Sequence, residues 1–127
     1  MSKIKNVIIV EDSEIDRKRL EELLKHYDFK VHSFDHPKDA LDAISSIQPE
    51  LVLLDFIMPQ MNGATFMVQL SERLTHNPNW QVFLVTSAQF DEEESASMLT
   101  LGITKIIEKP ISKEVLNNAI LSVEESI

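Results

Sequence analysis

The chain has 127 residues and a formal net charge of -9, because 21 acidic side chains outnumber 12 basic ones. Such a negative charge repels nucleic-acid phosphates and favours a protein partner or a cation. The sequence contains no cysteine, which excludes disulfides and thiolate metal sites and predicts a reducing, cytoplasmic location. No stretch approaches the roughly 20 apolar residues that span a bilayer, so no membrane association is predicted.

The composition has no break, linker or repeat, which predicts one domain over residues 1–127. Short runs rich in β-branched residues predict strands. They cover residues 6–10, 30–34, 51–55, 81–85 and 105–108. Segments with helical spacing lie between them, and this alternation indicates an α/β fold with a five-stranded parallel sheet and helices on both faces.

Each predicted helix has apolar residues that recur on one face. In the first helix these residues are Ile15, Leu20, Leu23, Leu24 and Tyr27. The second has Ala40, Leu41, Ile44 and Ile47, and the third has Phe66, Met67, Leu70 and Leu74. A loop at 75–80 precedes the fourth strand, and a fourth helix covers about residues 91–101. The last helix places together Val115, Leu116, Ala119, Ile120 and Val123.

Ligands of open α/β sheets bind beyond the carboxyl ends of the strands. The residues expected there are Glu11, Asp12, Asp55, Thr86, Ser87, Lys109 and Pro110. Nucleotide-binding folds carry glycines after the first strand, but this chain has only two glycines in total and an acidic pair at that position. The edge is therefore predicted to bind a cation rather than a dinucleotide.

Asp55 ends the apolar run LVLLD, and a carboxylate is costly to bury unless something pairs with it. Three carboxylates at close quarters need a strong counter-charge to stay ionised. Hard oxygen ligands that leave room for water suit Mg²⁺. A phosphoryl group on Asp55 would complete the arrangement, with Mg²⁺ and Lys109 neutralising its oxygens and the Thr86 hydroxyl donating to one of them.

Four motifs together resemble the receiver domain of two-component response regulators. They are the acidic pair Glu11 and Asp12, LLDFIMPQMNG around Asp55, VTSA around Thr86, and LGITKIIEKPIS around Lys109 and Pro110. The order and strand-end placement of these motifs make the resemblance specific, and it covers nearly the whole chain. It implies a flavodoxin-like (βα)5 fold with strand order 2-1-3-4-5 and five helices.

The resemblance also implies roles for individual residues. Asp55 is expected to be the phospho-acceptor, supplied by a histidine on a sensor kinase or a histidine phosphotransfer protein. Asp12 would bind Mg²⁺ directly and Glu11 through water, with the backbone carbonyl of Ile57 as a further ligand. Lys109 would contact a phosphoryl oxygen. The protein is accordingly expected to be a regulatory phospho-acceptor rather than an enzyme.

Signal transmission is expected to begin when Thr86 turns toward the phosphoryl group. The resemblance implies that a downstream protein reads the face formed by the fourth helix, fifth strand and fifth helix. Many receivers carry Tyr or Phe where this chain has Ile106, so an aliphatic side chain replaces the usual aromatic switch. A cis peptide bond is implied between Lys109 and Pro110.

Phosphoryl lifetime is expected to depend on Ile57 and Ala88, which flank the approach of water in the resembled family. Neither side chain can hydrogen-bond a water molecule, which predicts a long-lived phosphoryl group on Asp55.

Two alternative functions stay open. The first is a Mg²⁺-dependent aspartyl-phosphate phosphatase of the haloacid dehalogenase type, although EDSE after the first strand lacks the Asp-x-Asp pair of that group. The second is an adaptor that works without phosphorylation.

Overall fold

The computed structural model describes residues 3–74 and 79–126, and within these ranges five parallel strands form one sheet in the order β2-β1-β3-β4-β5. The strands are β1 (Asn6–Val10), β2 (Lys30–Phe34), β3 (Leu51–Asp55), β4 (Gln81–Thr86) and β5 (Lys105–Glu108). They alternate with α1 (Glu14–Leu24), α2 (Pro37–Ile47), α3 (Gly63–Arg73), α4 (Glu92–Thr100) and α5 (Lys113–Ser126). The predicted flavodoxin-like topology is confirmed. Of the loop predicted at 75–80, residues 75–78 lie outside the described part.

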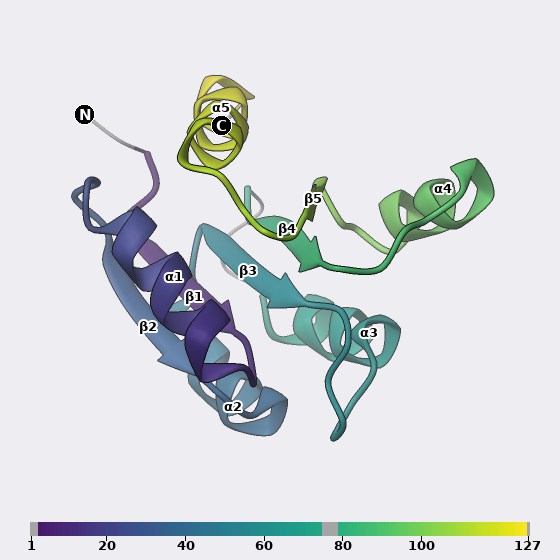
Figure 1. Ribbon diagram of the computed structural model, residues 1–127. Coiled ribbons are helices and arrows are strands. Elements are labelled where there is room, and N and C mark those ends of the chain that lie inside the picture. Colours follow the sequence, from purple (N-terminus) through teal and green to yellow (C-terminus); the bar gives the residue numbers. More distant parts are fainter. Residues whose placement is uncertain (1–2, 75–78, 127) are drawn as a thin grey trace.

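The helices cover both faces of the sheet (Figure 1). α1 and α5 pack on one face, and α2 and α3 pack on the other. Successive strand residues point to opposite faces, so Val7 and Ile9 join the first core while Ile8 and Val10 join the second. No helix in the described part of the chain combines the length and apolar character needed to cross a membrane.

The strand register brings the carboxyl ends of the strands to one edge of the sheet. Val10 of β1 lies beside Leu54 of β3, and Asp55 lies beside Val85 of β4. Thr86, the last residue of β4, lies beside Glu108 of β5. The segments that follow β1, β3, β4 and β5 therefore start close together, although up to about 100 residues separate them in sequence.

Gly63 at the start of α3 shapes the segment that follows β3. A Cβ atom at this position would lie 2.7 Å from Cδ1 of Phe56, a distance that side chains do not tolerate. The absence of a side chain lets α3 approach Phe56, the residue directly after Asp55. The Phe56 ring in turn meets the edge of Phe90, with centroids 5.3 Å apart and an interplanar angle of 88°.

Two residues assigned to buried helix faces are in fact exposed, which corrects the predicted faces. Ile15 on α1 is 82% exposed, and Val115 on α5 is 50% exposed. At about 100° per residue, Ile15 lies roughly 130° around α1 from the middle of its buried stripe. Val115 likewise lies roughly 90° around α5 from the middle of its buried stripe, so both side chains lie outside the face that packs on the sheet.

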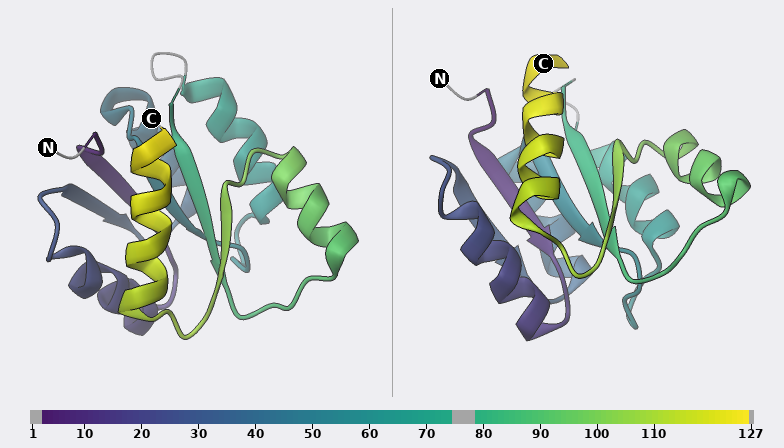
Figure 2. Two further views of the ribbon diagram at one scale, coloured as in Figure 1. Left: turned by 90° about the horizontal axis from the view of Figure 1, so that it is seen from above. Right: turned by 45° about the horizontal axis from the view of Figure 1, so that its top comes forward.

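The fourth helix differs from the others in its packing. In the described chain, α4 contributes no buried residue. Figure 2 shows it at the margin of the molecule beyond β5. Its start is nevertheless well defined, because Asp91 and Glu94 form a capping box in which the Glu94 amide donates to Asp91 Oδ1 at 2.8 Å.

Candidate functional site

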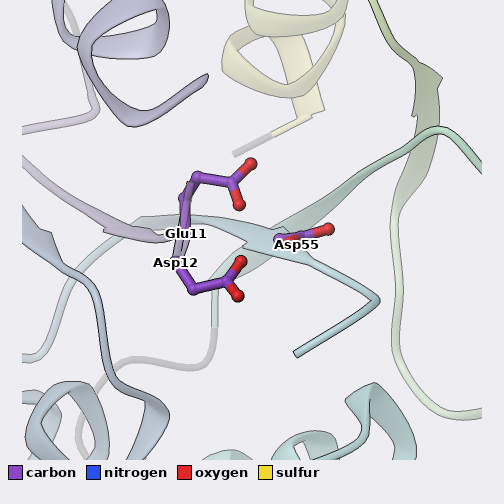
Figure 3. Close-up of side chains that lie close together, drawn as sticks. All are labelled: Glu11, Asp12 and Asp55. Atoms are coloured by element: carbon purple, nitrogen blue, oxygen red, sulfur yellow. The ribbon is translucent and has the colours of Figure 1, made fainter. Parts of the chain in front are cut away.

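Three carboxylates converge at the carboxyl edge of the sheet (Figure 3). Glu11 and Asp12 follow β1, Asp55 ends β3, and one oxygen from each lies within 4.8 Å of the others. Glu11 is 1% exposed and Asp55 is 7% exposed, whereas Asp12 faces solvent. The sequence prediction of a shared acidic edge therefore holds in three dimensions.

Backbone contacts fix the position of Glu11. Its amide donates to the carbonyl of Phe34 on β2 at 3.0 Å, which extends the pairing of β1 and β2 by one residue. The guanidinium of Arg17 donates to the Glu11 carbonyl at 3.0 Å. The Glu11 side chain is therefore held inward from a segment that is anchored on both sides.

Burial dominates the electrostatics of the two inner carboxyl groups. Burial and then the neighbouring Asp55 raise the pKa of Glu11 from 4.5 to about 7, although Lys109 acts in the opposite direction. Burial also raises the pKa of Asp55, an effect reduced by Glu11, Lys109 and the amide of Ile57. Both groups are harder to ionise than in water, so a cation at this edge would favour their charged forms.

Lys109 supplies the positive charge among the described residues of this cluster. Its Nζ lies 2.6 Å from Glu11 Oε1, 2.8 Å from Asp16 Oδ2 and 3.7 Å from Asp55 Oδ1. Burial by itself would lower the pKa of Lys109, but the hydrogen bonds with Asp16 and Glu11 raise it to about 12. The ammonium is therefore charged at neutral pH and stands next to the Asp55 carboxylate.

Sequence reasoning missed Asp16 as part of this cluster. This residue lies in the first turn of α1, and its carboxylate accepts a hydrogen bond from Lys109 across 93 residues of sequence. A weak signal was present, because Asp16 follows Asp12 by four residues at the start of a helix and so points toward the same end of the sheet.

Thr86 is completely buried at the end of β4. Its hydroxyl accepts a hydrogen bond from the amide of Ala88 at 3.0 Å, and its carbonyl accepts one from the amide of Lys109 at 2.9 Å. Thr86 thus ties the segments after β4 and β5 together. In the segment after β5, the peptide bond between Lys109 and Pro110 is cis.

The residues expected to control water access and switching lie around this edge. The amide of Ile57 donates to Asp55 Oδ1 at 3.3 Å, and its side chain is 58% exposed. Ala88 and Ile106 line an open pocket of about 350 Å³ together with Phe90, Ser95 and other residues next to α4. Ile106 is partly buried in the core on the α2 and α3 face.

The cluster is chemically suited to a divalent cation beside a nucleophilic carboxylate. Its donors are carboxylate oxygens, which Mg²⁺ prefers, and the exposure of Asp12 leaves room for water ligands. Lys109 can neutralise an anionic group attached to Asp55 from the side of α1. A set of acidic oxygens, one lysine and one strand-end hydroxyl can thus accommodate phosphoryl transfer to Asp55.

Comparison with known proteins identifies the class. A family model described as the response regulator receiver domain matches residues 7–121, and the chain belongs to this family. Hybrid signal transduction histidine kinase D of Dictyostelium discoideum is 31% identical over 112 residues, which are 87% of this chain and 7% of the kinase. Protein-glutamate methylesterase/protein-glutamine glutaminase 3 of Rhodospirillum rubrum is 32% identical over 105 residues, which are 82% of this chain and 28% of that protein. The chain spans less than a third of either relative.

Solved structures agree on the fold. A CheY-like response regulator receiver domain from Methylobacillus flagellatus matches with a TM-score of 0.81 and 22% identity, covering 96% of this chain and 100% of that one. Chemotaxis protein CheY4 of Vibrio cholerae matches with a TM-score of 0.81 and 20% identity, covering 94% and 98%. The resemblance drawn from the sequence motifs is confirmed at the level of the family and its fold.

Proposed function

We propose that this chain is a phospho-accepting response regulator of a two-component system or phosphorelay, in which Asp55 receives a phosphoryl group from a phosphohistidine. The donor would be a sensor histidine kinase or a histidine phosphotransfer protein. The observation that carries the proposal is a buried carboxylate at a strand end, with Lys109 at 3.7 Å and two further carboxylates beside it. We further propose that residues 1–127 act as one domain in the cytoplasm.

The transfer step forms one bond and breaks one. An oxygen of the Asp55 carboxylate attacks phosphorus, the nitrogen–phosphorus bond of the donor histidine breaks, and the departing imidazole nitrogen keeps the electron pair and takes a proton from water. The attacking carboxyl group must be ionised. Because burial raises the pKa of Asp55, the nearby ammonium of Lys109 assists by favouring the charged form.

The carboxylates of Glu11, Asp12 and Asp55, with the backbone carbonyl of Ile57, would hold Mg²⁺. Bound there, the ion would neutralise charge on the phosphoryl oxygens. Lys109 would neutralise a different phosphoryl oxygen. The buried Glu11 side chain would keep this lysine at the edge of the sheet through their 2.6 Å contact.

A switch from the site to the β5 edge is supported by the contacts of Thr86 and Phe56. The Thr86 hydroxyl now accepts from the Ala88 amide, and a turn toward the phosphoryl group would release that amide and the segment leading to α4. Phe56, next to Asp55, contacts Phe90 in this same segment. With Ile106 in place of an aromatic ring, the backbone before α4 would carry the change.

The output surface would be the face formed by α4, β5 and α5. Four consecutive acidic residues, Asp91 to Glu94, open α4, and Glu108 ends β5 beside the pocket. This charge favours a downstream protein with a basic contact surface. ¹H–¹⁵N spectra recorded with and without beryllofluoride should show changes across this face, and changes confined to the carboxylate cluster would contradict a working switch.

Acetyl phosphate and beryllofluoride test the function directly. With Mg²⁺ present, the wild-type protein should gain a phosphoryl group detectable by intact mass, and Asp55→Asn should not. The exposed control Asp42→Asn should be modified like wild type. Continuous hydrolysis of acetyl phosphate without accumulation of phosphorylated protein would favour the phosphatase alternative, which the family match already disfavours. No reaction and no beryllofluoride binding would favour the adaptor.

A further inference from the structure

The ammonium group of Lys109 faces three carboxyl groups at unequal distances. It has three N–H donors. Two of its neighbours, Glu11 Oε1 at 2.6 Å and Asp16 Oδ2 at 2.8 Å, lie within hydrogen-bond distance, while Asp55 Oδ1 lies beyond it at 3.7 Å. In this state the lysine is therefore bound to the α1 side of the cluster rather than to Asp55.

The contacts of Lys109 with Glu11 and with Asp16 differ in how much free energy is needed to break them. The side chain of Glu11 is 1% exposed, so water cannot reach it to replace the lysine, and losing this contact is costly. The side chain of Asp16 is 42% exposed, so water can replace the lysine at little cost. A new anionic acceptor near Asp55 would therefore displace Asp16 rather than Glu11.

We propose that Asp16 is a positioning residue that holds Lys109 in the unphosphorylated protein and competes with the phosphoryl group on Asp55 for this lysine. The inference rests on the proposed function and adds a regulatory residue to it. Asp16 lowers the affinity of the site for the phosphoryl group, because its contact with Lys109 holds Nζ away from Asp55 and lengthens when the lysine moves toward the phosphoryl group.

The exchange also connects the phosphoryl group to α1. Asp16 lies in the first turn of this helix, and its amide donates to the Ser13 hydroxyl that caps it. When Lys109 leaves, the Asp16 carboxylate turns to solvent and the environment of the first turn changes. Phosphorylation thereby also changes the environment of α1, on the face of the sheet opposite to the one affected through Thr86 and α4.

Beryllofluoride titrations in the presence of Mg²⁺ test the competition. Asp16→Asn should bind beryllofluoride about two- to five-fold more tightly than wild type, the range expected for losing one partly exposed ion pair. Glu14→Gln removes a charge from the same helical turn without contacting Lys109, and its affinity should stay at the wild-type value. Asp16→Glu keeps the charge and should restore wild-type affinity.

Amide spectra supply a second measurement. On beryllofluoride addition, the amides of residues 13–16 should shift in wild type and Glu14→Gln, and this response should shrink in Asp16→Asn because the contact is already absent. Equal affinities, or equal shifts in all three proteins, would overturn the inference while leaving the proposed function intact. Loss of beryllofluoride binding in wild type itself would instead contradict the proposed function, and with it the inference.

Discussion

The centre of the sheet and its β5 edge are packed very differently. Every residue of β3 is buried, and two carboxyl groups, Glu11 and Asp55, are buried with them at its carboxyl end. At the edge, α4 buries none of its described residues and borders a pocket of about 350 Å³. The centre is thus tightly packed around two acidic groups, whereas the helix at the edge has few buried contacts.

This difference suggests how a small chemical change can move a distant surface. Buried charges that repel one another are sensitive to a phosphoryl group, a cation or a proton, because low polarity strengthens their interactions. An element with few buried contacts needs little free energy to shift. The signal would therefore begin at the buried carboxyl groups in the centre of the sheet. It would change the position of α4 at the β5 edge, where a shift costs little free energy.

The largest expected contrast is between core truncations in the two regions. Leu53→Ala in β3 should lower the free energy of unfolding by about 2–5 kcal/mol, because it leaves a cavity in a fully buried site. Leu99→Ala in α4 should change it by less than about 0.5 kcal/mol, since that side chain is 57% exposed. Urea denaturation measures both values. Similar losses would remove the distinction between centre and edge.

The pH dependence of the free energy of unfolding should reveal the buried carboxyl group of Glu11 at the centre of the sheet. Between pH 4.5 and about 7 the folded protein keeps a proton on Glu11 that the unfolded chain has lost. The free energy of unfolding of metal-free protein should therefore fall as pH rises through this window, by up to roughly 3 kcal/mol. Glu11→Gln should show a markedly smaller fall in thermal or urea unfolding. An unchanged slope would mean that Glu11 is not the group responsible.

Removing one charge from the centre should relieve repulsion. In metal-free protein, Asp55→Asn should raise the melting temperature by a few degrees, equivalent to about 1 kcal/mol, because Glu11 and Asp12 lose a like-charged neighbour. Asp42→Asn on the exposed side of α2 serves as the control and should have little effect. Saturating Mg²⁺ should stabilise wild type more than Asp55→Asn. Equal or lower metal-free stability of Asp55→Asn would show that the three carboxylates are not mutually destabilising.

The smallest expected effect concerns access of water to the phosphorylated centre. Ile57 lies beside Asp55 with its side chain 58% exposed and offers no hydrogen bond to an attacking water. Ile57→Asn should speed loss of the phosphoryl group several-fold, or about 1 kcal/mol in the barrier. Val68→Asn exchanges an exposed apolar side chain on α3 and should leave the rate alone. The decay of phosphoprotein after removal of acetyl phosphate gives the rates, and no acceleration would place control of water elsewhere.

Local patterns in the sequence were sufficient to predict the strands, the helices and most of the acidic edge. Apolar runs such as LVLLD and the periodicity of the helices are local signals, and parallel strands bring their carboxyl ends together whatever their separation. The grouping of Glu11, Asp12, Asp55 and Lys109 could therefore be predicted without coordinates.

The contacts that these residues make, and which apolar residues remain exposed, depend on the tertiary packing. The contact of Asp16 with Lys109 depends on how α1 lies against the segment after β5, and no local pattern encodes that distance. Ile15 is apolar in sequence yet exposed, because it lies outside the face of α1 that packs on the sheet. Likewise, the raised pKa of Glu11 follows from burial and from the neighbouring Asp55, and both are set by the packing of the whole chain rather than by neighbours in sequence.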